Sequence, residues 1–200
     1  MELGDVTDRG RSVARRSLRV LSEMLGEPEG LEDVLALRVT HATWDPFFQE
    51  TLRVVPDGDS VLEGVRGVET VVVDVGMVAE GVRRSVEALG ASLRVASREG
   101  ERVEGDTVTG SGMRRILEEE SRVAVVVGNA PTAAEKLLER PGPVEVAVVL
   151  PVGVGALEVK RRLLEDPPFP VVTNVSYRGG TPAAVAVFNA VVSEALGGRG

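Results

Sequence analysis

The sequence predicts an α/β fold with a mainly parallel sheet, helices on both faces and an N-terminal helical segment. Short Val-rich runs alternate with amphipathic stretches from residue 68 onward, and the first fifty residues carry apolar side chains at helical spacing. The composition agrees, because 43% of the 200 residues are apolar but only 3% are aromatic. Val, Leu and Ala suit buried parallel strands under closely packed helices. We expect a single domain over residues 1–200, with segment 1–50 packed on it.

The N-terminal segment is expected to form two helices. In the first, Ala14, Leu18, Leu21 and Leu25 fall on one face, and Gly26 stands where a C-cap belongs. In the second helix the same spacing continues up to residue 41, through Leu31, Val34, Leu35 and Val39. Both stretches are amphipathic and therefore need a surface to pack on.

Strands and helices are expected to alternate through the rest of the chain. The strands are 68–75, 92–97, 123–129, 144–153 and 170–175. The helices are 78–89, 113–120, 131–140, 156–165 and 181–196. In the last helix Thr181 is the expected N-cap and Pro182 the expected first residue. That helix is apolar on more than one face, so either the N-terminal helices or another subunit should cover it.

The residue content excludes several classes of function. The chain has no cysteine and a single histidine, which rules out disulfides and thiolate nucleophiles and argues against an ordinary zinc or iron site. No apolar run suits a membrane span and no apolar leader follows the first charges, so we expect a cytoplasmic protein without a membrane partner. The net charge is −8 and arginines alternate with glutamates, so nucleic acid is not an expected partner.

Three glycine-containing turns are expected to carry the chemistry: 128–132, 151–155 and 178–182. Each follows a strand, so all three should lie at one edge of a parallel sheet, where backbone N–H groups and helix N-termini favour anions. The alternative is that the glycines only let the backbone bend. The candidate ligand contacts in these turns are Gly128, Asn129, Ala130, Thr132, Gly153, Arg178, Gly179, Gly180 and Thr181.

Asp74 and Met77 are further candidates for contact with a ligand. Asp74 ends the first Val-rich strand and Met77 begins the stretch that follows it, so both can face the same cleft. The alternative role of Asp74 is to cap the following helix. Both roles remain open at the level of sequence.

His41 lies in the stretch HATWDPF, residues 41–47. A lone histidine after an apolar helix is most often structural. This stretch, however, resembles the histidine motif of the precorrin-8X methylmutases, isomerases of corrin-ring biosynthesis, and Arg16 and Ser17 match the Arg-Ser pair on the helix that precedes it in that family. The resemblance continues in order over nearly the whole chain, through 71–82, 127–133, 151–160 and 178–190.

The resemblance implies a reaction and a set of residues. The reaction moves a methyl group from carbon 11 to carbon 12 of a tetrapyrrole that carries many carboxylates, and it requires neither a metal nor an organic cofactor. His41 is implied to be the acid that protonates or hydrogen-bonds the ring C nitrogen, a role that suits the ordinary imidazole pKa of about 6.5. Ser17 and Thr43 are implied to contact the substrate, and a homodimer is implied as the assembly.

A polycarboxylate substrate requires local positive charge in a chain of net charge −8. Arg178, beside the paired glycines, and either Arg83 or Arg84 are the candidates, with a solvated surface charge as the alternative for each. Several positions depart from the family pattern. Among them, Val108 falls where the family has an active-site arginine, and Tyr177 stands where the family has an arginine before the paired glycines. A non-catalytic relative that binds a corrinoid or other tetrapyrrole is therefore the alternative function, and an unrelated protein binding a phosphorylated ligand ranks last.

Overall fold

The computed structural model describes residues 7–197 and contains a six-stranded sheet in the order β1-β6-β5-β4-β2-β3. Its strands are β1 (Leu52–Val55), β2 (Thr70–Val73), β3 (Ser92–Val95), β4 (Val123–Val127), β5 (Val144–Val149) and β6 (Val171–Asn174). The pairs are parallel except for the edge pair β1–β6, which is antiparallel. The predicted mainly parallel α/β fold is confirmed. The single domain stays a prediction, and its expected ends fall outside the described residues.

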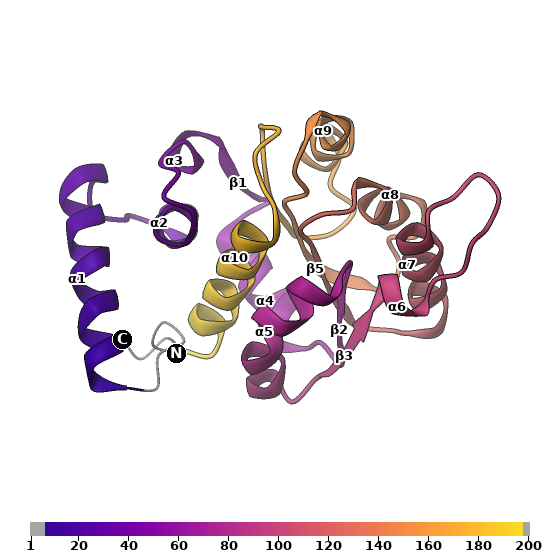
Figure 1. Cartoon of the computed structure of the whole chain (residues 1–200), viewed down its shortest axis with the longest axis horizontal. Helices are drawn as coiled ribbons and strands as arrows, with labels where there is room; N and C mark the ends of the chain where they lie inside the picture. The colour runs from indigo at the N-terminus through magenta and orange to yellow at the C-terminus, as the bar shows by residue number, and fades with distance from the viewer. Residues whose placement is uncertain (1–6, 198–200) are drawn as a thin grey trace.

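Helices cover both faces of the sheet (Figure 1). One face carries α4 (Gly58–Arg66), α5 (Gly76–Leu89) and α10 (Thr181–Ala195), with α2 (Leu31–Thr43) and α1 (Asp8–Leu25) farther out. The other carries α7 (Val108–Glu119), α8 (Pro131–Glu139) and α9 (Leu157–Glu165). The remaining helical turns are α3 (Phe48–Thr51), α6 (Ala96–Glu99) and the 3₁₀ turn η1 (Val154–Ala156). Over residues 7–197, every helix is too short or too polar to cross a membrane.

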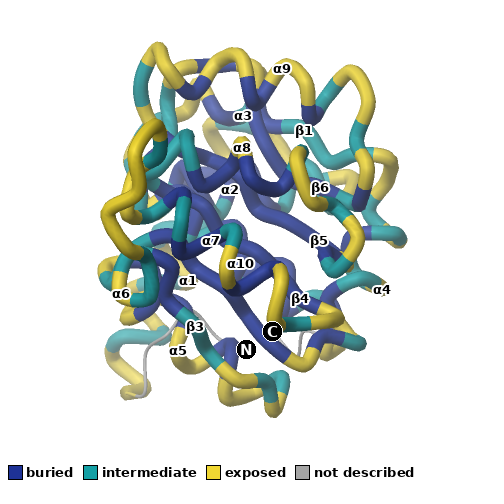
Figure 2. The backbone as a smooth tube through the Cα atoms, turned by 90° about the vertical axis from the view of Figure 1, so that its right-hand side faces the viewer, coloured by how far each residue is buried: buried dark blue, intermediate teal, exposed yellow. Residues whose placement is uncertain are grey.

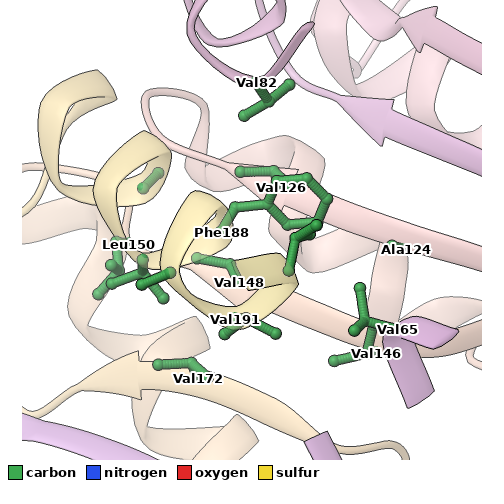
Figure 3. Close-up of a cluster of buried hydrophobic side chains, with 14 of the residues drawn as sticks. Val65, Val82, Ala124, Val126, Val146, Val148, Leu150, Val172, Phe188 and Val191 are labelled. Carbon is green, nitrogen blue, oxygen red and sulfur yellow. The ribbon is translucent and has the colours of Figure 1, made fainter. Parts of the chain in front are cut away.

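The sheet separates two hydrophobic cores. Successive side chains of a strand point to opposite faces, so Val71 and Val73 enter the core under α10 while Val72 enters the core under α7 and α8. Figure 2 shows the central strands β4 and β5 as mainly buried. Figure 3 shows Phe188 and Val191 of α10 among the valines of the sheet. Buried on both faces, these strands form a rigid base for the loops at their carboxyl ends.

Helix α10 is apolar on more than one face because other helices surround it. It packs against α2, α4 and α5 as well as against the sheet, so the N-terminal segment supplies part of the expected cover through α2. Helix α1 differs, because its main contact is with α2 alone and it stands at the outer side of the molecule (Figure 1). Its side chains Val13, Val20 and Met24 are exposed.

The helix caps agree with the sequence at one position and differ at another. Gly26 is the C-cap of α1, as expected, and Gly90 is the C-cap of α5. The expectation that Thr181 caps α10 is wrong: Gly180 is the N-cap, Thr181 is the first helical residue and Pro182 the second. Gly180 has a φ of 107°, a conformation that costs glycine little but strains a residue with a β-carbon.

Residues 51–67 contain two elements that the sequence patterns did not reveal. The two elements are strand β1 and helix α4, which follow the end of α3. Strand β1 has four residues and pairs only with β6, a partner more than a hundred residues away in the chain. Helix α4 has nine residues, and Gly58 and Gly64 lower its helix propensity.

Candidate active site

The histidine of this chain lies beside a pocket. His41 is in the last turn of α2, and the pocket of about 540 Å³ is lined by residues of α2, α5 and α10. Burial lowers the pKa of His41, and the charge of Arg38 lowers it further. The imidazole is therefore largely neutral at pH 7, and its imidazolium form is a stronger acid than free imidazolium.

The pocket is rich in positive charge. Arg38 comes from α2, and Arg83 and Arg84 come from α5. Among the described residues that line the pocket, the one acid is Glu80, which accepts a hydrogen bond of 2.8 Å from Arg83. A pocket of this size and charge suits a guest with several carboxylates, although the chain as a whole is acidic.

The sequence reasoning found Arg83 and Arg84 but missed Arg38. The structure brings the first two into the same pocket as His41, as the candidate role requires. Arg38 precedes His41 by three residues on one helix, so the two side chains share a face. That spacing is visible in the sequence and is the signal that would have identified it.

Close packing of α5 on α10 fixes the floor of the pocket. A β-carbon at Gly81 would lie 2.6 Å from the Val185 side chain, so only glycine allows this approach of the two helices. The Ser85 hydroxyl donates to Asn189 Oδ1 at 2.6 Å, and Asn189 Nδ2 donates to the Gly81 carbonyl at 3.0 Å. These bonds hold the two helices in register along the pocket.

The chain after His41 is tied to the third glycine turn. Trp44 ends α2 with a φ of 56°, and its N–H donates to the Thr40 carbonyl at 2.7 Å. Asp45 then forms an ion pair with the Arg178 guanidinium, which also lies 4.4 Å from the centroid of the Phe47 ring. Arg178 is thus engaged within the chain, and a substrate carboxylate would have to share it with Asp45.

Asp74 holds the first glycine turn in shape. Its fully buried carboxylate accepts hydrogen bonds from the backbone N–H groups of Gly128, Asn129 and Ala130 at 3.1, 2.6 and 2.9 Å. Burial raises the pKa of Asp74, and these bonds and one from the N–H of Val75 oppose that rise. The N-cap of α5 is Val75, so capping by Asp74 is not the arrangement that forms. Asp74 therefore supports the turn, and its contact with a ligand remains a prediction.

The glycine turns meet at the carboxyl edge of the sheet, as the sequence predicts. Asn129 Nδ2 donates to the Thr181 hydroxyl at 2.6 Å and so joins the first turn to the start of α10. The third turn lies against the end of β5, where a β-carbon at Gly179 would lie 2.1 Å from the Leu150 carbonyl oxygen. Pro182, one residue beyond Thr181, borders the pocket of His41.

The expectation that the turn N–H groups are available to an anion is wrong for six of them, including that of Arg178, which donates to the Ser176 hydroxyl at 3.1 Å. Those of residues 128–130 donate to Asp74, as described above. The N–H of Gly153 donates to the Tyr177 carbonyl and that of Gly180 to the Leu150 carbonyl, each at 2.8 Å. These N–H groups are therefore occupied within the fold, and the arginine side chains are the main candidates for binding an anionic guest.

Lys160 is buried beneath the third turn. Only 1% of its surface is exposed, and its ammonium nitrogen donates to the carbonyls of Ser176 and Arg178 at 2.8 and 2.9 Å. Burial lowers its pKa to about 7. The backbone that presents Arg178 is therefore supported from within the fold by a lysine side chain.

The other candidates lie outside the pocket of His41. Ser17 is on α1, and Met77 is exposed in the first turn of α5. The Thr43 hydroxyl donates to a carbonyl of its own helix at 2.8 Å, and the Thr132 hydroxyl is hydrogen-bonded to that of Thr107 at 2.7 Å. Their contacts with substrate remain predictions. Between residues 7 and 197, no cluster of three or more His, Asp or Glu side chains is placed to hold a metal ion.

Fold and site together define a class of protein: an α/β protein with a mainly parallel sheet and a pocket that is lined by three arginines and the one histidine of the chain. A family model described as precorrin-8X methylmutase matches residues 12–194. The chain therefore belongs to the precorrin-8X methylmutase family, the isomerases of corrin-ring synthesis.

Individual relatives agree with this assignment. The chain is 34% identical over 202 residues to the precorrin-8X methylmutase of Pseudomonas aeruginosa, with 92% of this chain and 96% of the relative covered. It is 31% identical over 195 residues to the cobalamin biosynthesis protein CbiHC of Archaeoglobus fulgidus, and it spans 42% of that longer protein. The crystal structure of the precorrin-8X methylmutase of Thermus thermophilus matches with a TM-score of 0.83 at 27% identity, covering 94% of this chain and 98% of that one.

Proposed function

We propose that this protein moves a methyl group from carbon 11 to carbon 12 of precorrin-8X or cobalt-precorrin-8. The observation that carries the proposal is the position of His41, the one histidine of a family member, in a pocket lined by three arginines. The reaction is an intramolecular rearrangement, so the protein has to hold the ring and manage one proton.

His41 is proposed to donate a proton or a hydrogen bond to the ring C nitrogen and to take the proton back after the methyl shift. Burial and the charge of Arg38 lower its pKa, which makes the imidazolium form a better proton donor. The neutral form that remains can then accept the proton again. This cycle consumes no external acid and agrees with a reaction in which nothing is added or removed.

The arginines of the pocket are proposed to bind carboxylates of the macrocycle. Arg38 and Arg83 approach from opposite walls, α2 and α5, and so can hold groups on two sides of a ring. Arg178 and the predicted contacts at the sheet edge would hold the part of the substrate that extends beyond the pocket. A tetrapyrrole is large enough to span both regions.

The protein is also proposed to be a cytoplasmic homodimer, as the resemblance implies. The exposed apolar side chains Val13, Val20 and Met24 on α1 support an interface there, because a monomer would leave them in water. Light scattering should give twice the mass of one chain. Replacing the three residues by serine should give the mass of one chain, and an unchanged mass would exclude α1 as the interface.

The alternative is a relative that binds a corrinoid without converting it. Val108 and Tyr177 favour this alternative, because each is exposed and stands where the family pattern has an arginine. Mixing the protein with precorrin-8X, and in parallel with its cobalt form, separates the two functions by visible spectroscopy. Appearance of the product chromophore supports the methylmutase, whereas a shifted spectrum that never becomes that of the product supports the binding protein.

A further inference from the structure

Arg38 differs from the other arginines of the pocket in having no side-chain partner of its own. Arg83 is hydrogen-bonded to Glu80, and Arg84 has an interaction elsewhere in the chain. Within residues 7–197, no carboxylate or carbonyl forms a hydrogen bond or ion pair with Arg38, and the charge of Glu194 acts on it only from a distance. Burial lowers the pKa of Arg38, which shows that its charge has lost part of its hydration.

The position of Arg38 couples it to His41. The two residues are one turn apart on α2, and both line the same pocket. Their mutual repulsion is the second cause of the low pKa of His41, after burial. The other charged groups that line the pocket are Glu80, Arg83 and Arg84, all from α5. Glu194 is the charged residue of α10 that acts on Arg38, and α1 and α3 contribute no described residue to the lining.

We propose that Arg38 binds a substrate carboxylate next to His41 and that this binding causes His41 to take up the proton that it uses in the reaction. A carboxylate on the guanidinium offsets the positive charge that repels the imidazolium form. The empty pocket therefore disfavours the protonated form of His41 through both burial and Arg38, and a carboxylate on Arg38 removes the second of these causes. The two effects are reciprocal, so protonation of His41 in turn favours a ligand that places a carboxylate on Arg38.

This inference rests on the proposed function and deepens it. It makes Arg38 a residue that touches substrate and also sets the charge of the proposed acid. It further explains how a histidine with a lowered pKa can act as an acid near neutrality: the substrate itself supplies the negative charge that restores its affinity for a proton. Proton transfer and substrate binding become one linked event.

The experiment uses the fact that the chain has one histidine, so a proton NMR titration shows a single imidazole Cε1–H signal for His41. The titration is run on the wild type, Arg38→Met, Arg38→Lys and the matched control Arg83→Met, each free and saturated with the corrin product. Steady-state KM for precorrin-8X is measured on the same four proteins. Arg83 lines the same pocket but is not a cause of the His41 shift, so its loss removes a cation without removing the coupling.

The proposal expects a higher His41 pKa in free Arg38→Met than in the wild type, and no such rise in Arg83→Met or Arg38→Lys. It expects the product to raise the His41 pKa in the wild type but to leave it nearly unchanged in Arg38→Met. The KM of Arg38→Met should rise roughly tenfold or more, the usual effect of losing a charge-assisted hydrogen bond. If Arg38→Met does not fold, Arg38→Gln carries the same test.

Two results distinguish failure of this inference from failure of the proposed function. Normal turnover by the wild type together with identical titrations of wild type and Arg38→Met would overturn the role of Arg38 alone. Absence of turnover by the wild type would overturn the proposed function. In that case, a rise in the His41 pKa on adding product, seen in the wild type but not in Arg38→Met, would still support carboxylate binding at Arg38. If the product did not raise the His41 pKa of the wild type, carboxylate binding at Arg38 would be overturned too.

Discussion

Arg178 and Asp45 form an ion pair that joins the third glycine turn to the end of the helix that carries His41. The two residues are 133 positions apart in the chain, and no other described ion pair connects the segment after α2 to the carboxyl edge of the sheet. The pair therefore fixes the imidazole relative to the turn that is expected to meet the substrate. Its importance lies in geometry rather than in the strength of one ion pair.

Arg178→Met should lower kcat/KM for precorrin-8X by about tenfold, because the end of α2 loses its attachment and the reacting groups are misplaced. Asp45→Asn should lower kcat/KM through the same loss of attachment, and the double variant should lose little more than Arg178→Met alone. Arg161→Met is the matched control, since Arg161 pairs with Glu158 and Glu165 on the exposed face of α9. Additive losses for Arg178→Met and Asp45→Asn would contradict a shared role.

Asp74→Asn should lower the free energy of unfolding by roughly 3 kcal/mol, because the amide keeps one oxygen for the N–H groups of residues 128–130 but loses the negative charge and turns its NH2 group toward the N–H of Val75. Urea denaturation measures the change. Asp57→Asn is the control, because Asp57 is the N-cap of α4 and asparagine caps almost as well as aspartate. Equal stability of Asp74→Asn and the wild type would show that the turn does not depend on the carboxylate.

Lys160 should make the stability depend on pH. Its pKa is lowered from 10.5 to about 7 in the folded protein, so the unfolded chain binds more protons between these values. The free energy of unfolding should therefore rise with pH across that window. Below the folded pKa, Lys160 is protonated in both states and adds no pH dependence. Lys160→Met should remove this rise. Urea midpoints measured on both sides of neutrality test it, and parallel slopes for the two proteins would exclude the lysine as the cause.

Gly179→Ala should prevent stable folding of the third turn, because the new β-carbon would lie 2.1 Å from the Leu150 carbonyl oxygen. Gly142→Ala is the control, since a β-carbon there meets no atom within 4 Å. The midpoint of thermal unfolding should fall for Gly179→Ala and should stay close to that of the wild type for Gly142→Ala. A Gly179→Ala protein with wild-type stability would mean that the turn can move away from β5.

Much of the fold could be predicted from the sequence because its signals are local. The Val-rich runs mark β2, β4, β5 and β6, and the alternation with amphipathic stretches predicts the parallel sheet. Strand β1 was missed because its pairing with β6 is long-range and its four residues carry no pattern of their own. Thr181 was misplaced because a threonine before a proline is a good cap by composition, whereas the positive φ of Gly180 decides where the helix begins.

The site was only partly predictable for a similar reason. The motif around His41 and the glycine turns are contiguous in sequence, so their presence and order could be read directly. The partners of their polar groups are not contiguous. Asp74 occupies the N–H groups of a turn that begins 54 residues later, and Asp45 occupies the guanidinium of Arg178. Which groups remain available to a ligand therefore depends on the assembled fold.

The measurement that tests the central claim most directly compares the wild type with His41→Ala in the conversion of precorrin-8X, followed by its visible spectrum in a single turnover. The affinity of both proteins for the corrin product is measured alongside. The account predicts conversion by the wild type, and for His41→Ala a bound substrate whose spectrum never becomes that of the product, with the affinity retained. Conversion by His41→Ala at the wild-type rate would contradict the account, because the proton would then be handled without the only histidine of the chain.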